Sequence, residues 1–232
     1  ASPQKVCRLP ERSLRDPTCL HYPRSIGSTH NLGVSHPDPM LVTPIPLVGE
    51  GVRLDPLVRE DAPVIATVLV PETFRYFVSI QPRSYDLEGI RDFVDQLLEA
   101  PGTLAFVVRS RTDGSVLGMS CYLDIRSDHR ALEIGMTWYI EAVRGTRVNP
   151  ECKLLLLGHA FEDLGAVRVT LKTDLRNEHS QAAIAKLGAV KEGVLRKHGI
   201  QPNGYVRDTV FYSVLDEEWP KVREGLLARL GR

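Results

Sequence analysis

The sequence predicts one mixed α/β domain, residues 47–232, that follows an N-terminal arm, residues 1–46. Segments in which apolar residues alternate, as in strands, interleave with segments that have the apolar spacing of helices. In order they read strand, two helices, three strands, helix, strand, helix, two strands and a last helix. The sequence contains no repeat at a fixed period.

The arm differs from the rest of the chain in composition. Half of the 16 prolines lie in residues 1–46, together with His21, His30 and His36, and no helical or strand spacing is evident. Such a segment buries too little apolar surface to offset its ordering entropy. We therefore expect the arm to be poorly ordered or strap-like. A further hypothesis is that Met40 is the natural start, which N-terminal sequencing of the native protein would test.

Each element of the domain has its own signal. Leu87, Ile90, Phe93 and Leu97 lie on one face of a predicted helix, and Asp113-Gly114 is typical of a hairpin turn between two strands. The predicted strands are 50–57, 103–110, 115–125, 131–140, 167–174, 189–200 and 205–215. The predicted helices are 59–70, 86–100, 150–165, 178–188 and 216–230, with Pro220 in the first turn of the last one.

Bulk properties exclude several classes of protein. Lys plus Arg equals Asp plus Glu, 29 each, so no basic field indicates a nucleic-acid partner. No apolar run approaches the roughly 18 residues of a membrane span, and the start lacks the apolar stretch of a signal peptide. We expect a cytoplasmic protein with no membrane partner.

No metal site is expected. Neither the four cysteines, Cys7, Cys19, Cys121 and Cys152, nor the histidines have the spacing of metal ligands. We interpret the cysteines as buried or incidental thiols. We expect His129, His159, His179 and His198 to have core, cap or solvent roles.

A polar, basic loop, "RGTRVNPE", separates the strand at 131–140 from the helix at 150–165. Asn149 has the residue type of an N-cap and Pro150 that of the first helical position, and Gly165 would close the helix. Amides at such a helix start bind anions, and arginines add phosphate donors. The alternative is a capped helix with solvated arginines.

From about Leu47 to Trp219 the chain resembles the GNAT superfamily of acyl-CoA N-acyltransferases, in particular its RimJ/RimL-like branch, which acetylates protein N-termini. The likeness is carried by "LEIGMTWYI", "RGTRVNPECKLLLLGHAFEDLGAVRVTLKTD", "RNEHSQAAIAKLGA" and "EGVLRKHGIQPNGYVRDTVFYSVLDEEWP". The resemblance implies a GNAT-like α/β fold, in which helices flank a splayed central sheet. It also implies acetyl-CoA as co-substrate.

In that family the loop after the fourth strand reads [Q/R]-x-x-G-x-[G/A], and its amides hold the pyrophosphate of coenzyme A. Arg144 matches the first position, whereas Arg147 and Asn149 stand where small residues are usual. If the loop uses only its amides, Arg147 can add a phosphate contact. The cofactor site implied by the resemblance is Trp138, Tyr139, Ile140, Arg144, Gly145, Thr146, Arg147, Val148, Asn149, Asn177 and Lys186. For Lys186 a solvated helix position is the alternative.

Glu133 is the candidate general base. It lies in an apolar strand, on the face that alternation gives to Gly135, Thr137 and Tyr139. Apolar surroundings raise the basicity of a carboxylate, and similar enzymes use a glutamate on this strand as the base. The alternatives are an exposed charge at the strand end and an ion pair with an arginine.

Asn177 and Ser180 complete the predicted catalytic group. Their i,i+3 spacing fits one helical face or an N-cap, and capping alone is the alternative role of Asn177. Many superfamily members have a tyrosine that acts as general acid at the position of Ile184. Isoleucine cannot donate a proton. The RimJ/RimL-like branch offers a serine instead, so Ser180 is the predicted proton donor.

The predicted function is acetyl transfer from acetyl-CoA to a primary amine, by direct attack in a ternary complex. The acceptor is a protein N-terminus or a small-molecule amine. Phe74, Tyr76 and Phe77, after the first helix, are candidates to line the acceptor side. A non-catalytic acyl-CoA-binding or regulatory protein is the alternative, and a homodimer that involves the arm stays open.

Overall fold

The computed structural model describes residues 38–78 and 80–232. His21, His30, His36, Cys7 and Cys19 therefore lie outside the described residues, as does most of the predicted arm. Met40 is buried, and its amide donates a hydrogen bond to Ser127 O at 3.2 Å. The predicted boundary between arm and domain at residue 46 stays a prediction.

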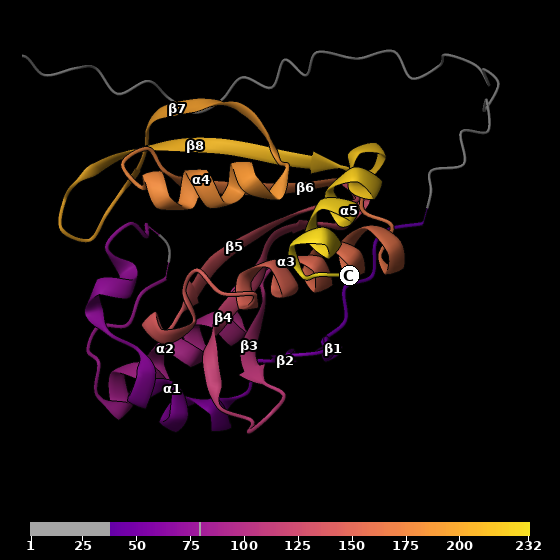
Figure 1. Ribbon diagram of the computed structural model, residues 1–232. Coiled ribbons are helices and arrows are strands. Elements are labelled where there is room, and N and C mark those ends of the chain that lie inside the picture. Colours follow the sequence, from indigo (N-terminus) through magenta and orange to yellow (C-terminus); the bar gives the residue numbers. More distant parts are fainter. Residues whose placement is uncertain (1–37, 79) are drawn as a thin grey trace, which may run out of the picture. The chain divides into compact units, whose positions relative to one another are not determined.

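The described residues form a mixed sheet of eight strands in the order β1-β2-β3-β4-β5-β6-β8-β7 (Figure 1). The strands are β1 Leu47–Val48, β2 Val52–Pro56, β3 Leu104–Ser110, β4 Val116–Arg126, β5 Ala131–Tyr139, β6 Arg168–Asp174, β7 Val190–Ile200 and β8 Val206–Leu215. All neighbours are antiparallel except β5 and β6, which run parallel. The predicted mixed α/β class is confirmed, and the short β1 was not predicted.

Helices cover both faces of the sheet. They are α1 Ala62–Val68, α2 Leu87–Glu99, α3 Val148–Gly158, α4 Glu178–Leu187 and α5 Trp219–Arg229. Apolar residues of α1 and α2 share one buried cluster with β3 and β4, and those of α3, α4 and α5 share a second cluster on the other face. Every predicted helix is present, with ends shifted by a few residues.

Local signals explain most of these ends. Asp86 caps α2 by accepting a hydrogen bond from the Gly89 amide at 2.8 Å. Ile90, Phe93 and Leu97 are buried as predicted, but Leu87 is exposed because it lies in the first turn, beyond the sheet contact. A π-helical turn, His159–Asp163, follows α3, and Gly165 then reverses the chain at φ +64°, as predicted.

The sheet divides between β5 and β6. Only three residue pairs join these strands, and the last is Glu133 with Thr170. Beyond this point Ile134–Tyr139 pairs with β4 alone among the described strands, so one edge of β5 keeps its backbone groups for another partner. This divergence is the splay that the resemblance implied, and it positions the candidate site.

Candidate active site

A cavity of about 770 Å³ lies where β5 and β6 diverge. Its walls come from β5, β6, the loop before α3, the helices α3 and α4, and the segment 72–78. The predicted site residues that line it are Glu133, Trp138, Tyr139, Arg144, Gly145, Thr146, Asn149, Asn177, Ser180 and Lys186. Three predicted residues, Ile140, Arg147 and Val148, do not line it.

The loop before α3 differs from its prediction in one respect. The helix begins at Val148, with Arg147 as N-cap and no side-chain cap, so Asn149 is not the N-cap and Pro150 is the third helical residue. Thr146 Oγ1 accepts a hydrogen bond from the Val148 amide at 3.3 Å instead. Asn149 Oδ1 accepts a hydrogen bond from the Tyr139 hydroxyl at 3.3 Å, which ties α3 to β5.

The loop nevertheless presents amides at a helix N-terminus. The amides of Gly145, Arg147 and Asn149 donate no hydrogen bond within the described residues. Gly145 has φ +75° and turns the chain, whereas Arg147 has φ −69°, which any residue adopts. The arginine at a position where the family favours glycine therefore introduces no backbone strain.

Three basic side chains line the cavity at this end: Arg144, Lys186 and Arg229. Arg144 Nε donates to Tyr139 O at 3.1 Å, and Arg229 Nη1 donates to Lys186 O at 3.5 Å. Arg229 was not predicted, because it arrives from the distant helix α5 and no local pattern marks it. Cations beside a helix start have the chemistry that suits an anionic group.

The Arg147 side chain points elsewhere. Its Nη2 lies 3.7 Å from Glu50 Oε2 and 3.5 Å from Leu230 O. The interpretation of Arg147 as an added phosphate donor is therefore corrected: its guanidinium is engaged by residues outside the cavity wall, and only its amide remains available.

Glu133 is buried, 4% exposed, and forms an ion pair with Lys172 on β6 at 2.7 Å. The alternative of an exposed strand-end charge is thus wrong, and the ion-pair alternative holds with a lysine in place of an arginine. Burial raises the pKa of the Glu133 carboxyl, and the Lys172 ammonium opposes this without cancelling it. The group can accept a proton near neutrality more readily than an exposed glutamate.

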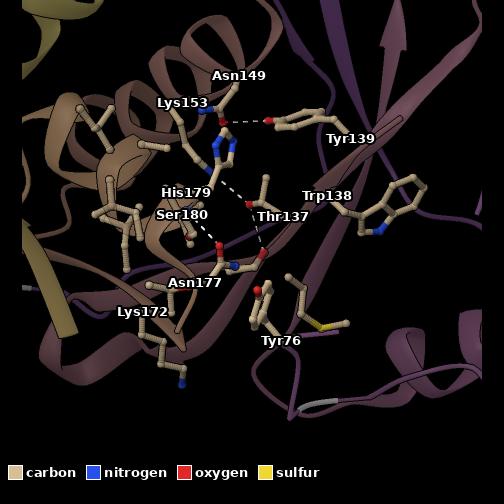
Figure 2. A pocket seen from close by; sticks show the side chains of 18 of the residues that line it. Tyr76, Thr137, Trp138, Tyr139, Asn149, Lys153, Lys172, Asn177, His179 and Ser180 are labelled. Atoms are coloured by element: carbon tan, nitrogen blue, oxygen red, sulfur yellow. Dashed lines mark hydrogen bonds between the residues drawn. The ribbon is translucent and has the colours of Figure 1, made fainter. Parts of the chain in front are cut away.

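A bulge in β5 changes the predicted face. Met136 has φ +46°, and the pairing with β4 shifts between Gly135 and Trp138. Alternation breaks there, so Tyr139 packs in the cluster that contains α3, and Met136 and Trp138 pack in the cluster of α1 and α2. Glu133 stays on the face of Gly135, but the prediction that it shares this face with Thr137 and Tyr139 is wrong, because Thr137 bonds to Lys153 of α3. Figure 2 shows the Trp138 indole directed away from the other labelled side chains.

Asn177 and Ser180 both line the cavity. Asn177 is the N-cap of α4, since its Oδ1 accepts a hydrogen bond from the Ser180 amide at 3.1 Å. The capping role is thus present, together with a place in the cavity wall. His179 of the same turn also lines the cavity (Figure 2).

Lys153 of α3 is a cavity residue that the sequence did not single out. It is 7% exposed, and its Nζ donates to Thr137 Oγ1 at 2.9 Å and to Ser120 Oγ at 3.5 Å. Burial lowers the pKa of its ammonium to about 8. Its spacing of four from Asn149 places both on one helix face, and this is the signal that could have identified it.

The opposite end of the cavity is lined by Tyr76, Phe77 and Leu123. The segment 75–77 is held by the β7–β8 hairpin: Arg207 Nη1 donates to Tyr76 O at 2.8 Å, and Gln201 Nε2 donates to Arg75 O at 3.0 Å. Phe74 is buried in the core and does not line the cavity.

The remaining candidates have structural roles. Cys121 and Cys152 are buried free thiols, as expected, and burial raises the pKa of each to about 12. His159 is buried in the core, where its Nδ1 lies 2.8 Å from Asp163 Oδ2. Within the described part of the chain, His, Cys, Asp and Glu form no group of three that could hold a metal ion. No helix of that part is long and apolar enough to cross a membrane.

Comparison with known proteins decides the family. A family model described as "Acetyltransferase (GNAT) domain" matches residues 52–190. The chain belongs to this family. The predicted resemblance is thereby confirmed, and the chain is an acyltransferase by its family.

Relatives agree with this assignment. The solved structure of a "putative acetyltransferase" from T. thermophilus is 41% identical with a TM-score of 0.76, over 82% of this chain and 100% of that chain. The "Putative ribosomal N-acetyltransferase YdaF" of Bacillus subtilis is 34% identical over 107 residues, which are 46% of this chain. The match covers only 57% of that relative's length.

A third relative shares the fold alone. "Mycobacterium smegmatis RimJ in complex with CoA-disulfide" is 21% identical with a TM-score of 0.64, over 78% of this chain and 90% of that chain. The name of the Bacillus relative agrees with the predicted RimJ/RimL-like branch.

Proposed function

We propose that this protein transfers the acetyl group of acetyl-CoA to a primary amine in a ternary complex. The observation that carries the proposal is one cavity with different chemistry at its two ends. Basic side chains and unpaired amides at the start of α3 line one end, and the buried Glu133–Lys172 pair lies toward the other. The end with the basic side chains suits binding of a pyrophosphate, and the end with the Glu133–Lys172 pair suits proton removal from an amine.

The residues present fit coenzyme A as co-substrate. The amides of Gly145, Arg147 and Asn149, with Arg144, Lys186 and Arg229, would hold its phosphates. The edge of β5 at Ile134–Tyr139, which has no partner strand among the described residues, offers backbone groups to the amides of the pantetheine arm. Acetyl-CoA would supply an activated acyl carbon, and no covalent enzyme intermediate is needed.

Glu133 would take a proton from the acceptor amine, directly or through water. Its buried carboxyl has a raised pKa, so it is a stronger base than an exposed glutamate, and the Lys172 ammonium offsets part of that rise. Ser180 and Asn177 lie in the wall formed by α4, where Ser180 can donate a hydrogen bond to the departing sulfur.

For the acceptor, we propose the α-amine of a protein N-terminus. The support is the name of the Bacillus relative, a ribosomal N-acetyltransferase. The acceptor end of the cavity carries the aromatic rings of Tyr76 and Phe77, which can pack against the first side chain of a peptide. A small-molecule amine is the second acceptor class to test.

The test is an acetylation assay with peptides of varied N-terminal residues and a panel of small amines. Release of free CoA would be followed with a thiol reagent, and the product would be identified by mass spectrometry. A peptide acetylated at its α-amine supports the proposal. If acetyl-CoA raises the melting temperature but no amine is acetylated, the protein is a non-catalytic acyl-CoA-binding protein.

A further inference from the structure

Lys153 is a buried cation whose polar partners are uncharged. Its Nζ contacts the hydroxyls of Thr137 and Ser120, and it forms no ion pair with a described carboxylate. Glu133, which lines the same cavity, pairs with Lys172 instead. A buried ammonium without a counter-ion is costly, so its presence in a cavity wall indicates that an anion forms or binds beside it.

The position of Lys153 beside β5 indicates which group of a bound ligand could be that anion. Thr137, its closest partner, lies in the middle of Ile134–Tyr139, the edge of β5 that has no partner strand among the described residues. Figure 2 shows the Lys153 amine directed toward Thr137 of this strand. The phosphate-binding cations lie nearer the start of α3, so Lys153 is separate from them in the wall.

We propose that Lys153 protonates the sulfur of coenzyme A as the acetyl group leaves. This inference rests on the proposed acetyl transfer and deepens it. Lys153 would hold its ammonium against the developing thiolate, donate the proton to sulfur, and stay behind as a neutral amine bonded to Thr137. The sequence-based interpretation gave this role to Ser180.

The step balances in protons and electrons. The acceptor nitrogen forms a bond to the thioester carbon and gives up one proton toward Glu133 or water. The carbon–sulfur bond breaks, its electron pair stays on sulfur, and the Lys153 proton joins that pair to give the thiol. Lys153 regains a proton from solvent when products leave.

Lys153 differs from the neighbouring hydroxyls and thiols in its acid strength, which matters for a proton donor to sulfur. A serine hydroxyl such as that of Ser180 is a far weaker acid than a thiol, so it can hydrogen-bond to sulfur without yielding a proton. Burial raises the pKa of Tyr139 well above its ordinary value and those of Cys121 and Cys152 to about 12. Burial lowers the pKa of Lys153 to about 8, with both thiols opposing that change, which is close to the ordinary 8.5 or so of a thiol. Lys153 is therefore mostly protonated, and able to donate a proton, below about pH 8.

The test uses coenzyme A itself, without acceptor, as a probe of the charge beside sulfur. The full chain is saturated with reduced CoA, and thiolate formation is followed by its ultraviolet absorbance as pH rises. Wild type is compared with Lys153→Met, Lys153→Arg and Lys191→Met, the last being a control at an exposed lysine of β7. Binding is confirmed separately by the melting temperature with and without CoA.

We expect the ionisation constant of bound CoA in wild type and Lys191→Met to exceed that of free CoA by about tenfold. A much larger increase would leave the proton on the lysine and not on sulfur, and would contradict the proposed proton transfer. Lys153→Arg should keep this increase, because its charge is permanent, yet lose turnover, because arginine does not release a proton. Lys153→Met should lose both the increase and the turnover.

Two further results would overturn the inference in distinguishable ways. If CoA binds but ionises in wild type no more readily than free CoA, Lys153 does not face the sulfur, and the proposed acetyl transfer still stands. If CoA does not raise the melting temperature at all, the proposed function fails and takes the inference with it. The wild-type titration decides even if a Lys153 variant does not fold.

Discussion

Glu133 on β5 and Lys172 on β6 form a buried ion pair, with 2.7 Å between Oε2 and Nζ, at the point where the two strands cease to pair. The pair therefore lies at the inner end of the cavity that the divergence opens. Burial raises the pKa of Glu133 more than Lys172 lowers it. This relationship gives the carboxylate a base strength that depends on its neighbour.

Glu133→Gln should reduce kcat by about 10²–10⁴-fold, because the glutamine cannot accept a proton. Affinity for acetyl-CoA, measured by calorimetry, should be unchanged. The pH profile gives a second measurement: a glutamate base works only when deprotonated, so the wild-type rate falls as pH falls through its raised pKa. Lys172→Met should move that fall to higher pH, since removal of the cation raises the carboxyl pKa further.

The control is Glu88→Gln, at an exposed position of α2, which should change neither kcat nor the pH profile. A Glu133→Gln enzyme with undiminished kcat would show that the amine reaches the thioester already deprotonated.

Arg229→Ala should weaken binding of coenzyme A by about tenfold or more, the effect of losing one charge-assisted hydrogen bond to a phosphate. Arg229 lines the cavity beside Lys186. Isothermal titration calorimetry with CoA and with pantetheine, which lacks all the phosphates of CoA, measures the effect. The loss should appear only with CoA, because pantetheine carries no pyrophosphate.

Arg223→Ala is the matched control on the same helix. Arg223 is half-exposed and pairs with Glu162 away from the cavity, so this variant should bind CoA as wild type does. Equal losses in both variants would mean that the effect comes from the net charge of α5 rather than from a phosphate contact.

The sequence was sufficient for the fold and for part of the site. Periodicity placed α2 and the two hairpins because each depends on residues adjacent in the chain, such as Asp86 and Asp113-Gly114. It misplaced the start of α3 because Asn149 has the chemistry of a cap and yet bonds to Tyr139, a contact across two elements. The bulge at Met136 also escaped prediction, since no glycine marks its positive φ.

Site residues from distant segments could not be predicted either, because they join the cavity only through contacts between elements far apart in the sequence. Arg229 joins the cavity only after α5 packs against α3 and α4. In the sequence, Lys153 is one of two charged residues at the start of an apolar helix, with Glu151, and its polar contacts come from Ser120 and Thr137 of two strands. In contrast, Glu133 and Asn177 stood in segments whose family resemblance was already evident.

Arg176→Met should raise KM for the acceptor a few-fold and leave CoA affinity unchanged. The Arg176 guanidinium lies 3.5 Å from the centre of the Tyr205 ring and 5.7 Å from that of Tyr76. It thereby joins the segment around Tyr76, at the end of the cavity that we propose for the acceptor, to the β7–β8 hairpin. A partly exposed cation–π contact contributes about 0.5–1 kcal/mol, which sets the size of the change in initial-rate measurements.

Arg75→Met is the comparison for this effect. Arg75 lies 5.4 Å from the centre of the Tyr76 ring but makes no such contact with Tyr205 in the described part of the chain, so it does not join the two segments. If both variants raise KM equally, the ring of Tyr76 matters and its link to the hairpin does not.

Lys153→Met should make the protein more stable at neutral pH. The folded-state pKa of Lys153, about 8, is below its ordinary 10.5, so folding disfavours the ammonium. This penalty is complete below about pH 8, shrinks as pH rises, and is gone above 10.5. Methionine fills the space without charge, and Ser120 and Thr137 still bond to each other at 2.7 Å. The gain in unfolding free energy at pH 7 should approach about 3 kcal/mol.

Urea unfolding of wild type and Lys153→Met at about pH 7 and about pH 10 measures this gain, with Lys191→Met as the exposed control. The gain should be largest at neutral pH and smaller in the alkaline buffer, because wild-type Lys153 is then neutral. A constant loss of stability at both pH values would instead show that Lys153 is kept for its hydrogen bonds. A gain at neutral pH together with lost turnover would mean that the protein retains a destabilising charge because its reaction uses it.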